Sequence, residues 1–220
     1  MKIGVLTYSL NHFKTNQIVR GLIARGIKKI KIIIVPFKKF KKRNPIINHR
    51  PVQFGENSLS KICNKYKIKI IKIEEKKVFN GLDFAIIGGS GIINKKYIKK
   101  NFIINCHPGL IPQTRGLDSF KWAILKNNLI GNTLHFIDNE IDEGKILHQK
   151  LTKIYKNDTM KTLAKRHYKN EIDLLINFDC HMKKKRIYKL TKCPAYLRMP
   201  VDLEKKVILG FNKWKKKFTK

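Results

Sequence analysis

Short apolar runs rich in β-branched residues recur along the chain, and segments with helical periodicity separate several of them. The runs predict strands at 2–8, 29–35, 68–73 and 83–87, one ending at His107, and two more near 133–137 and 145–155. Helices are expected at 14–25, from 58 onward, at 116–127, after Asp158 as the capping residue, and after Pro200. Strands that alternate with helices are typical of an α/β fold, with a mostly parallel central sheet and helices on both faces.

The polar residues best suited to chemistry gather between positions 101 and 149. The apolar run that starts at Phe102 ends in Asn105 and His107, and a loop with prolines and glycines follows. Side chains alternate along a strand, so both residues leave the same face if strand geometry persists to the end. Asp142 lies in an Asp-x-Gly turn after a later strand. Open α/β sheets bind ligands at the carboxyl ends of their strands, so a site is predicted where these three residues meet.

Several short motifs follow one another in a set order, and the whole series is more specific than any one of them. Positions 105–112 read Asn-x-His-Pro-x-Leu-x-Pro, and then come Arg115-Gly116, Thr133-x-His135 and Asp142-x-Gly144. This series resembles the formyltetrahydrofolate-dependent formyltransferases, which include glycinamide ribonucleotide formyltransferase, the catalytic domain of methionyl-tRNA formyltransferase and the nucleotide-sugar N-formyltransferases. The resemblance runs from about Asp83 to Gln149, and it implies a Rossmann-like formyltransferase fold.

The resemblance also implies roles for single residues. Asn105, His107 and Asp142 would be catalytic, with His135 and Thr133 in support. Formyl transfer passes through a tetrahedral oxyanion, to which the Asn105 amide and a protonated His107 would each donate a hydrogen bond. Asp142 would orient His107 and favour its protonated form. A cis Ile111–Pro112 peptide bond is expected on the same basis, and no metal is required.

The co-substrate implied by the resemblance is N10-formyltetrahydrofolate. Its pterin would lie in a pocket lined by the loop after the strand at 83–87, formed by Gly88, Gly89, Ser90, Gly91, Ile92 and Ile93. Glycines in such a loop let the backbone approach a ligand closely.

The acceptor is expected to bind elsewhere. In glycinamide ribonucleotide formyltransferase a glycine-rich turn after the first strand holds the substrate phosphate, but here the turn at 7–11 contains no glycine. A long loop at 36–54 carries Arg43, His49 and Arg50, which with Arg115 are the candidates for binding an anionic acceptor, because the guanidinium fork suits phosphate. A solvated basic loop is the alternative interpretation.

The net charge of +34 is extreme and would ordinarily indicate nucleic acid. Only 8 of the 49 basic residues are arginine, however, and the lysines are spread along the whole chain beside many Ile and Asn residues. Such a pattern favours a compositional bias over a binding groove. A nucleic-acid partner is therefore not expected.

The remaining features concern organisation and location. The four cysteines form no Cys-x-x-Cys pair, and no apolar run approaches the roughly 20 residues of a membrane span. We therefore expect free thiols, no membrane partner and a cytoplasmic protein. A catalytic domain is expected at 1–182 and a short extension with a basic helix at 183–220; whether the chain forms a homodimer stays open.

These observations predict transfer of a formyl group to a primary amine of an anionic acceptor, with a nucleotide-linked amino sugar preferred. Glycinamide ribonucleotide or Met-tRNA is the alternative acceptor. A basic RNA-binding α/β domain without enzymatic activity is the alternative from another class.

Overall fold

The computed structural model describes residues 1–36, 44–55, 59–98, 102–138, 144–182 and 193–219. Seven strands form one sheet in the order β3-β2-β1-β4-β5-β6-β7. The chain divides into two compact units, the first comprising Met1–Lys41 and Val52–Asn105, the second Lys42–Pro51 and Cys106–Lys220. The fold class predicted from the sequence is confirmed, because the sheet is mostly parallel and helices follow several of its strands.

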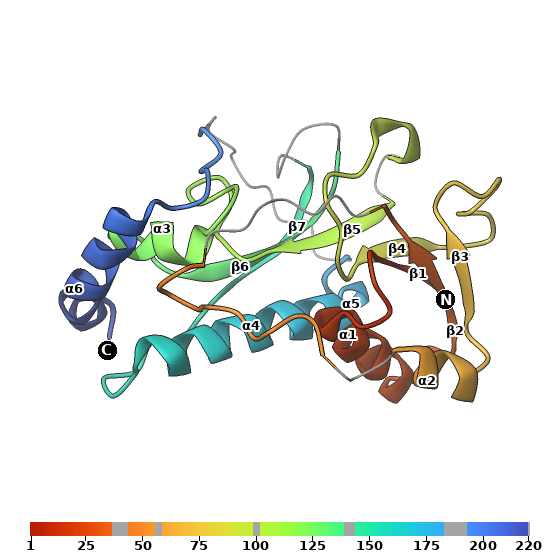
Figure 1. The fold of residues 1–220 in the computed structure, drawn as a ribbon, viewed down its shortest axis with the longest axis horizontal. Coiled ribbons are helices and arrows are strands. Elements are labelled where there is room, and N and C mark those ends of the chain that lie inside the picture. The colour runs from red at the N-terminus through yellow and green to blue at the C-terminus, as the bar shows by residue number, and fades with distance from the viewer. Residues whose placement is uncertain (37–43, 56–58, 99–101, 139–143, 183–192, 220) are drawn as a thin grey trace. The chain divides into compact units, whose positions relative to one another are not determined.

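The first unit is the parallel part of the sheet with its helices. Its elements are β1 (Lys2–Thr7), α1 (Phe13–Ala24), β2 (Lys29–Ile34), α2 (Leu59–Lys65), β3 (Lys69–Lys72), β4 (Phe84–Ile87), a 3₁₀ turn (Lys95–Tyr97) and the start of β5 (Ile103–His107). β1 pairs in parallel with β2 and β4, β2 with β3, and β4 with β5. Figure 1 shows α1 and α2 on the same side of β1 and β2. Ile18, Val19 and Leu22 of α1 are completely buried, as the periodicity predicts.

The second unit contains α3 (Ser119–Leu125), β6 (Gly131–Phe136), β7 (Ile146–Leu151), α4 (Met160–Ile176), α5 (Asp179–Met182) and α6 (Val201–Phe218). β7 is antiparallel to β6. α6 lies beside α3 (Figure 1) and buries Val207, Phe211 and Trp214 in a core shared with Phe120 and Leu163. The Trp214 indole also donates a hydrogen bond to the carbonyl of Asn128, 2.9 Å away. The basic helix predicted after Pro200 is thus integral to this unit. The boundary predicted at residue 182 adjoins 183–192, which lie outside the described residues.

The start of α4 differs from the prediction. Its N-cap is Thr159, whose side chain accepts a hydrogen bond from the Thr162 amide in a capping box, so the prediction of Asp158 as the cap is wrong. Asp158 is instead held by both guanidinium nitrogens of Arg166, at 2.7 and 2.8 Å. A bidentate ion pair of this kind is stronger than a single neutral hydrogen bond, which explains why the carboxylate faces Arg166.

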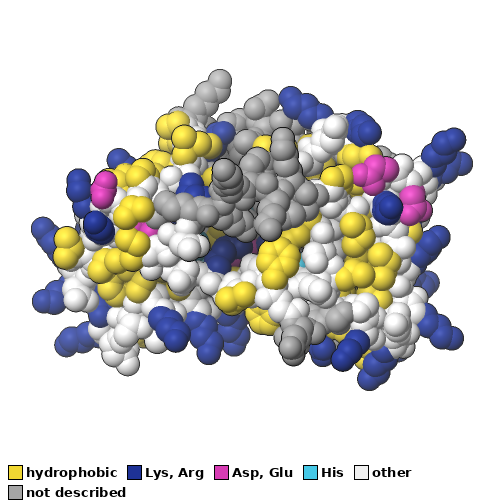
Figure 2. All heavy atoms as spheres, viewed as in Figure 1, with side chains coloured by type: hydrophobic (Ala, Val, Ile, Leu, Met, Phe, Trp, Pro, Cys, Tyr) yellow, Lys and Arg dark blue, Asp and Glu magenta, His cyan; other side chains and the backbone are white. Residues whose placement is uncertain are grey.

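Basic side chains are spread over the face shown in Figure 2 and are not gathered into one patch. None of the described helices is both long and apolar enough to cross a membrane.

Candidate active site

β5 ends in the polar residues that the sequence singles out. Ile103 and Ile104 are buried and pair with Ala85 and Ile86 of β4. Asn105 and His107 follow within the same strand, two positions apart, so they belong to the same face of β5. His107 is 4% exposed. The pairing of these apolar residues with β4 thus holds β5, the strand that carries Asn105 and His107, in place.

One nitrogen of His107 is engaged by the loop that follows β5. Its Nε2 lies 2.7 Å from the carbonyl oxygen of Thr114. A carbonyl oxygen can only accept, so Nε2 must carry the proton and donate it. Nδ1 then gains a proton only in the imidazolium form. A proton or hydrogen bond given by His107 to a substrate would therefore come from Nδ1.

The loop at 108–114 is itself held tightly. The Thr114 amide donates to the Leu110 carbonyl at 2.9 Å, and the Leu110 amide donates to the Thr114 hydroxyl at the same distance. Gly109 packs so closely that a Cβ there would lie 2.4 Å from the Thr114 oxygen and 2.7 Å from His107 Nε2. Only glycine fits at this position, since the contact is to backbone. The Ile111–Pro112 bond is cis, as predicted.

Thr133 and Gln149 of the second unit fix the same loop from the neighbouring strands β6 and β7. The Thr133 hydroxyl donates to the Gly109 carbonyl at 2.7 Å and accepts from the Ile111 amide at 3.1 Å. The Gln149 amide donates to the Ile111 carbonyl at 2.7 Å and to the Thr133 hydroxyl at 3.1 Å. Thr133, for which a supporting role was predicted, thus contacts the loop that follows His107. Gln149 was not predicted, although its strand alternation with Leu147 and Leu151 could have indicated it.

His135 is buried on the same face of β6 as Thr133. Its Nδ1 lies 2.9 Å from the Phe136 carbonyl and therefore donates to it. Asp142, which His135 was predicted to support, lies outside the described residues, as does Arg43. The predicted meeting of Asn105, His107 and Asp142 stays a prediction.

The glycine loop after β4 belongs to the first unit, where its two halves differ. A Cβ on Gly88 would lie 2.6 Å from the Thr15 hydroxyl, and one on Gly89 would lie 2.5 Å from the His12 ring. Close packing against the start of α1 therefore requires these two glycines. Gly91 has open space around it, and Ile92 is 87% exposed. The later half of the loop is the part available to a ligand.

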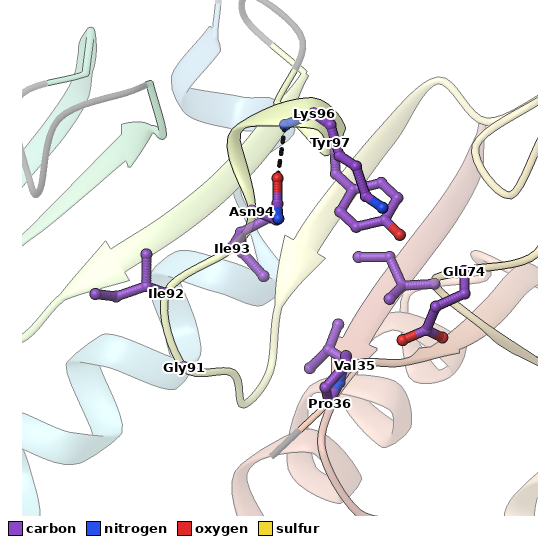
Figure 3. A pocket seen from close by; sticks show the side chains of 10 residues that line it. Val35, Pro36, Glu74, Gly91, Ile92, Ile93, Asn94, Lys96 and Tyr97 are labelled. Carbon is purple, nitrogen blue, oxygen red and sulfur yellow. Dashed lines mark hydrogen bonds between the residues drawn. The ribbon is translucent and has the colours of Figure 1, made fainter. Parts of the chain in front are cut away.

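A cavity of about 320 Å³ adjoins this later half (Figure 3). Gly91, Ile92 and Ile93 line it together with Val35, Pro36, Ile73, Glu74, Asn94, Lys96 and Tyr97. The Asn94 side chain accepts a hydrogen bond from the Lys96 amide at 3.1 Å, which shapes the turn on this wall. The lining combines apolar side chains with a few polar groups, and the volume lies in the range of small-molecule sites.

The turn after β1 is filled by its own side chains. His12 Nδ1 lies 2.8 Å from the Thr15 hydroxyl, which donates to Thr7 at 3.0 Å. The ring of Tyr8 packs against those of His12 and Phe54, with centroid distances of 4.7 and 5.6 Å. A turn built in this way differs from a glycine-rich phosphate loop, as the sequence indicated.

The predicted acceptor residues His49 and Arg50 pack against helices of the second unit. The His49 ring stacks on Phe120 with centroids 5.6 Å apart, and burial, with Arg50 and Lys121 nearby, lowers the pKa of His49 to about 3. The Arg50 guanidinium lies 2.6 Å from the Glu171 carboxylate. The backbone of Arg115 accepts a hydrogen bond from the Tyr196 amide at 2.9 Å. These contacts hold the residues in place and leave their role in acceptor binding a prediction.

The comparison with protein families shows which kind of protein contains a similar set of residues. Residues 84–178 match the model of the formyl transferase family, and this range includes Asn105, His107, Thr133 and His135. The segment that holds these four residues therefore resembles the formyl transferases.

A methionyl-tRNA formyltransferase is among the proteins that this chain resembles. Methionyl-tRNA formyltransferase of Thermodesulfovibrio yellowstonii is 30% identical over 174 residues, which is 76% of this chain and 55% of that protein. The chain thus spans about half the length of this relative.

Two solved structures share the fold of this chain. A 4-N formyltransferase from Francisella tularensis matches with a TM-score of 0.59 and 20% identity over 95% of this chain and 86% of that one. The N-formyltransferase from Helicobacter canadensis, solved with folinic acid and dTDP-3-aminofucose, gives the same score at 22% identity over 81% of this chain and 63% of that one.

Sequence reasoning missed several polar residues near the His107 loop. Thr114, Gln149 and His167 contact this loop, and Glu171 pairs with Arg50. Polar residues on the inner face of a predicted amphipathic helix were the available signal for His167 and Glu171.

Proposed function

We propose that this chain transfers the formyl group of N10-formyltetrahydrofolate to a primary amine of an anionic acceptor, with a nucleotide-linked amino sugar as the preferred acceptor. The observation that carries the proposal is the anchoring of His107. Its Nε2 is tied to Thr114, so the imidazolium can present Nδ1–H to a reacting oxygen. This residue follows Asn105 in the segment that matches the formyl transferase family.

The reaction needs stabilisation of negative charge more than it needs a nucleophile on the protein. The acceptor amine attacks the formyl carbon, and the carbonyl oxygen becomes an oxyanion in the tetrahedral intermediate. Asn105 and protonated His107 donate hydrogen bonds to that oxygen, and losing one such donor typically lowers turnover by ~10²–10³. The C–N10 bond then breaks, and N10 receives the proton that the amine gives up. Asp142 carries that proton, directly or through water, and favours the protonated form of His107.

The folate donor contacts the loop that the resemblance assigns to it. Gly91, Ile92 and Ile93 line the cavity of Figure 3, which supports the proposal of a ligand site on this loop. Gly88, Gly89 and Ser90 precede them and set the path of the backbone. The Helicobacter canadensis relative, solved with folinic acid, supports a folate as the ligand class.

The preference for an amino sugar nucleotide rests on the turn after β1, which contains no glycine, and on the structural relatives. The turn after β1 is filled by Tyr8, His12 and Thr15 and differs from a glycine-rich phosphate loop. A sugar nucleotide would reach Arg43, Arg50 or Arg115 for its charge, and His49, whose pKa is lowered to about 3, would offer a neutral hydrogen-bonding group. Met-tRNA is the second candidate, favoured by the Thermodesulfovibrio relative.

A direct assay separates the acceptors. N10-formyltetrahydrofolate and the chain are mixed with dTDP-linked 3-amino and 4-amino sugars, with glycinamide ribonucleotide or with Met-tRNA, and tetrahydrofolate release is measured together with the mass of the product. With an amino sugar nucleotide, we expect the product to gain the mass of one formyl group in place of a hydrogen. Formylation of Met-tRNA alone would overturn the preferred acceptor, and no formylation of any acceptor would overturn the proposed function.

A further inference from the structure

We propose that residues 196–204 form a clasp that positions the two segments predicted to bind the acceptor. One is segment 44–51, which carries Arg50, and the other is segment 115–118, which begins at Arg115. The inference rests on the proposed function, because the acceptor role of both segments belongs to that proposal. The clasp and both segments lie within the second unit.

The start of the clasp runs beside segment 115–118. The Tyr196 amide donates a hydrogen bond to the Arg115 carbonyl at 2.9 Å, and the Tyr196 carbonyl accepts one from the Leu117 amide at 2.8 Å. Gly116, which lies between these two partners, forms an isolated parallel β-bridge with Tyr196. Two backbone hydrogen bonds to one residue fix both the distance and the direction of the segment.

Helix α3 holds the same part of the clasp from its other side. The indole ring of Trp122 stacks on the ring of Tyr196, with centroids 4.6 Å apart and an angle of 15° between the planes. The indole nitrogen of Trp122 donates a hydrogen bond to the Leu197 carbonyl at 2.9 Å. The clasp is therefore fixed at this end by its backbone and by a side chain.

A buried ionic cluster continues the attachment toward α6. The Asp118 carboxylate accepts a hydrogen bond from the Met199 amide at 3.0 Å. Lys121 pairs with the same carboxylate at 3.1 Å and also with the carboxylate of Glu204. Lys121 and Glu204 are completely buried. A buried cation shared by two carboxylates is costly to separate from either, so the end of the clasp is tied to the end of segment 115–118.

Glu204 also holds the second segment. Its other carboxylate oxygen accepts a hydrogen bond from the Ile46 amide at 2.7 Å, and Ile47 lies in the core of the second unit. Arg50 follows four positions after Ile46. Glu204 thus uses one oxygen for Lys121 and the other for segment 44–51, so both predicted acceptor segments are attached to the clasp.

This arrangement assigns positioning roles to Tyr196 and Glu204. A phosphate-bearing acceptor that contacts both segments needs their donors at a fixed separation, because charge-assisted hydrogen bonds depend on distance and direction. Loosening the clasp should therefore weaken acceptor binding. The glycine loop proposed to bind folate belongs to the first unit, so folate affinity should be spared.

Two substitutions loosen the clasp at its opposite ends. In Gly116→Ala the new Cβ would lie 2.4 Å from the Tyr196 carbonyl oxygen and 2.6 Å from its amide nitrogen, at a φ of +92°, so the two backbones must separate. Glu204→Gln keeps the shape of the side chain but leaves one oxygen for two donors, Lys121 and the Ile46 amide, because an NH₂ group cannot accept.

Each substitution has a matched control. Gly26→Ala introduces the same kind of backbone strain at a φ of +80°, with no atom within 4 Å of the added Cβ. Asp202→Asn makes the same change from carboxylate to amide on an exposed residue in the first turn of α6.

The kinetic test uses N10-formyltetrahydrofolate with a dTDP-linked amino sugar as the acceptor. We expect both variants to raise the acceptor KM at least about 10-fold, the effect of losing roughly one charge-assisted hydrogen bond, with the folate Kd within about two-fold. Both controls should match the wild type. An unchanged acceptor KM in the folded variants, or an equal loss of folate affinity, would overturn the inference, since the clasp would then serve stability alone.

Amide hydrogen exchange followed by NMR provides a readout that does not depend on activity. Gly116→Ala should speed exchange of the Ile46 amide, and Glu204→Gln should speed exchange of the Leu117 amide, each at the end of the clasp away from the substitution. If the wild type formylates no acceptor while these changes are seen, the proposed function fails and the link between the two segments stands. Faster exchange only beside each substitution would refute the clasp whatever the activity.

Discussion

Replacing Gly109 by alanine adds one methyl group at the closest contact around His107. The new Cβ would lie 2.4 Å from the Thr114 oxygen, whereas real Cβ atoms essentially never come within 3.0 Å of another heavy atom. The carbonyl must therefore retreat by at least about 0.6 Å, the difference between these two distances. His107 Nε2 lies 2.7 Å from the same Cβ, and if it retreats to the same limit its hydrogen bond to this oxygen lengthens from 2.7 Å to about 3.2 Å, the long end of the usual range.

The consequence for catalysis follows from the geometry. With this anchor lengthened and weakened, His107 would hold Nδ1 less firmly in one direction, and we expect kcat to fall about 10²-fold. Overpacking of a tight site costs about 1–3 kcal/mol, so the variant should still fold. Formyl transfer is measured by tetrahydrofolate release at saturating substrates, with folding checked by thermal unfolding.

A matched glycine variant serves as the control. A methyl group added at Gly210 in α6 would have no heavy atom within 4 Å outside its own helix backbone and chain neighbours, so Gly210→Ala should keep full activity and gain up to about 1 kcal/mol from helix propensity. A folded Gly109→Ala enzyme with kcat within two-fold of the wild type would refute the idea that the Thr114 anchor orients His107.

Three further predictions concern other parts of the chain. Lys121→Met removes the cation between the buried carboxylates of Asp118 and Glu204. The free energy of unfolding should fall by about 3–5 kcal/mol and Tm by roughly 6–20 °C. A fall of less than about 1 kcal/mol would show that the cluster is not a stabilising link between α3 and α6. Gly89→Ala would place a methyl group 2.5 Å from the His12 ring, so we expect weaker folate binding in a fluorescence titration, and unchanged affinity would argue against a folate site on this loop. Hydrogen bonds from Arg166 lower the pKa of Asp158 to about 2; its stabilising contribution is present above the ordinary value of 3.8 and is lost as pH falls toward 2. Urea unfolding of Asp158→Asn should therefore depend less steeply on pH across this window than unfolding of the wild type, and equal slopes would contradict the pairing.

The strands and most helices could be predicted because their causes are local. β-branched runs such as residues 29–35 form strands, and the spacing of Ile18 and Leu22 places one face of α1 in the core. The position of His107 at the end of a buried strand also followed from the sequence, since the apolar run and the Pro-Gly loop are adjacent in the chain.

The contacts of Arg50 could not be predicted in the same way. Its partner Glu171 lies 121 positions away, and a basic residue in a proline-containing loop is usually solvated. Likewise, nothing local distinguishes Lys121 from the many exposed lysines, although its ammonium is buried between two carboxylates. Pairings of this kind depend on tertiary packing, so the sequence indicates the residue type and not the partner.

Single-turnover formyl transfer by the wild type and by His107→Ala tests the central proposal most directly. Enzyme in excess is loaded with N10-formyltetrahydrofolate, an amino sugar nucleotide is added, and the formylated product is followed with time, while folate affinity is measured separately. We predict rapid transfer by the wild type, and in His107→Ala a rate at least about 10²-fold lower with folate affinity little changed. A His107→Ala variant that transfers the formyl group at nearly the wild-type rate would contradict the account.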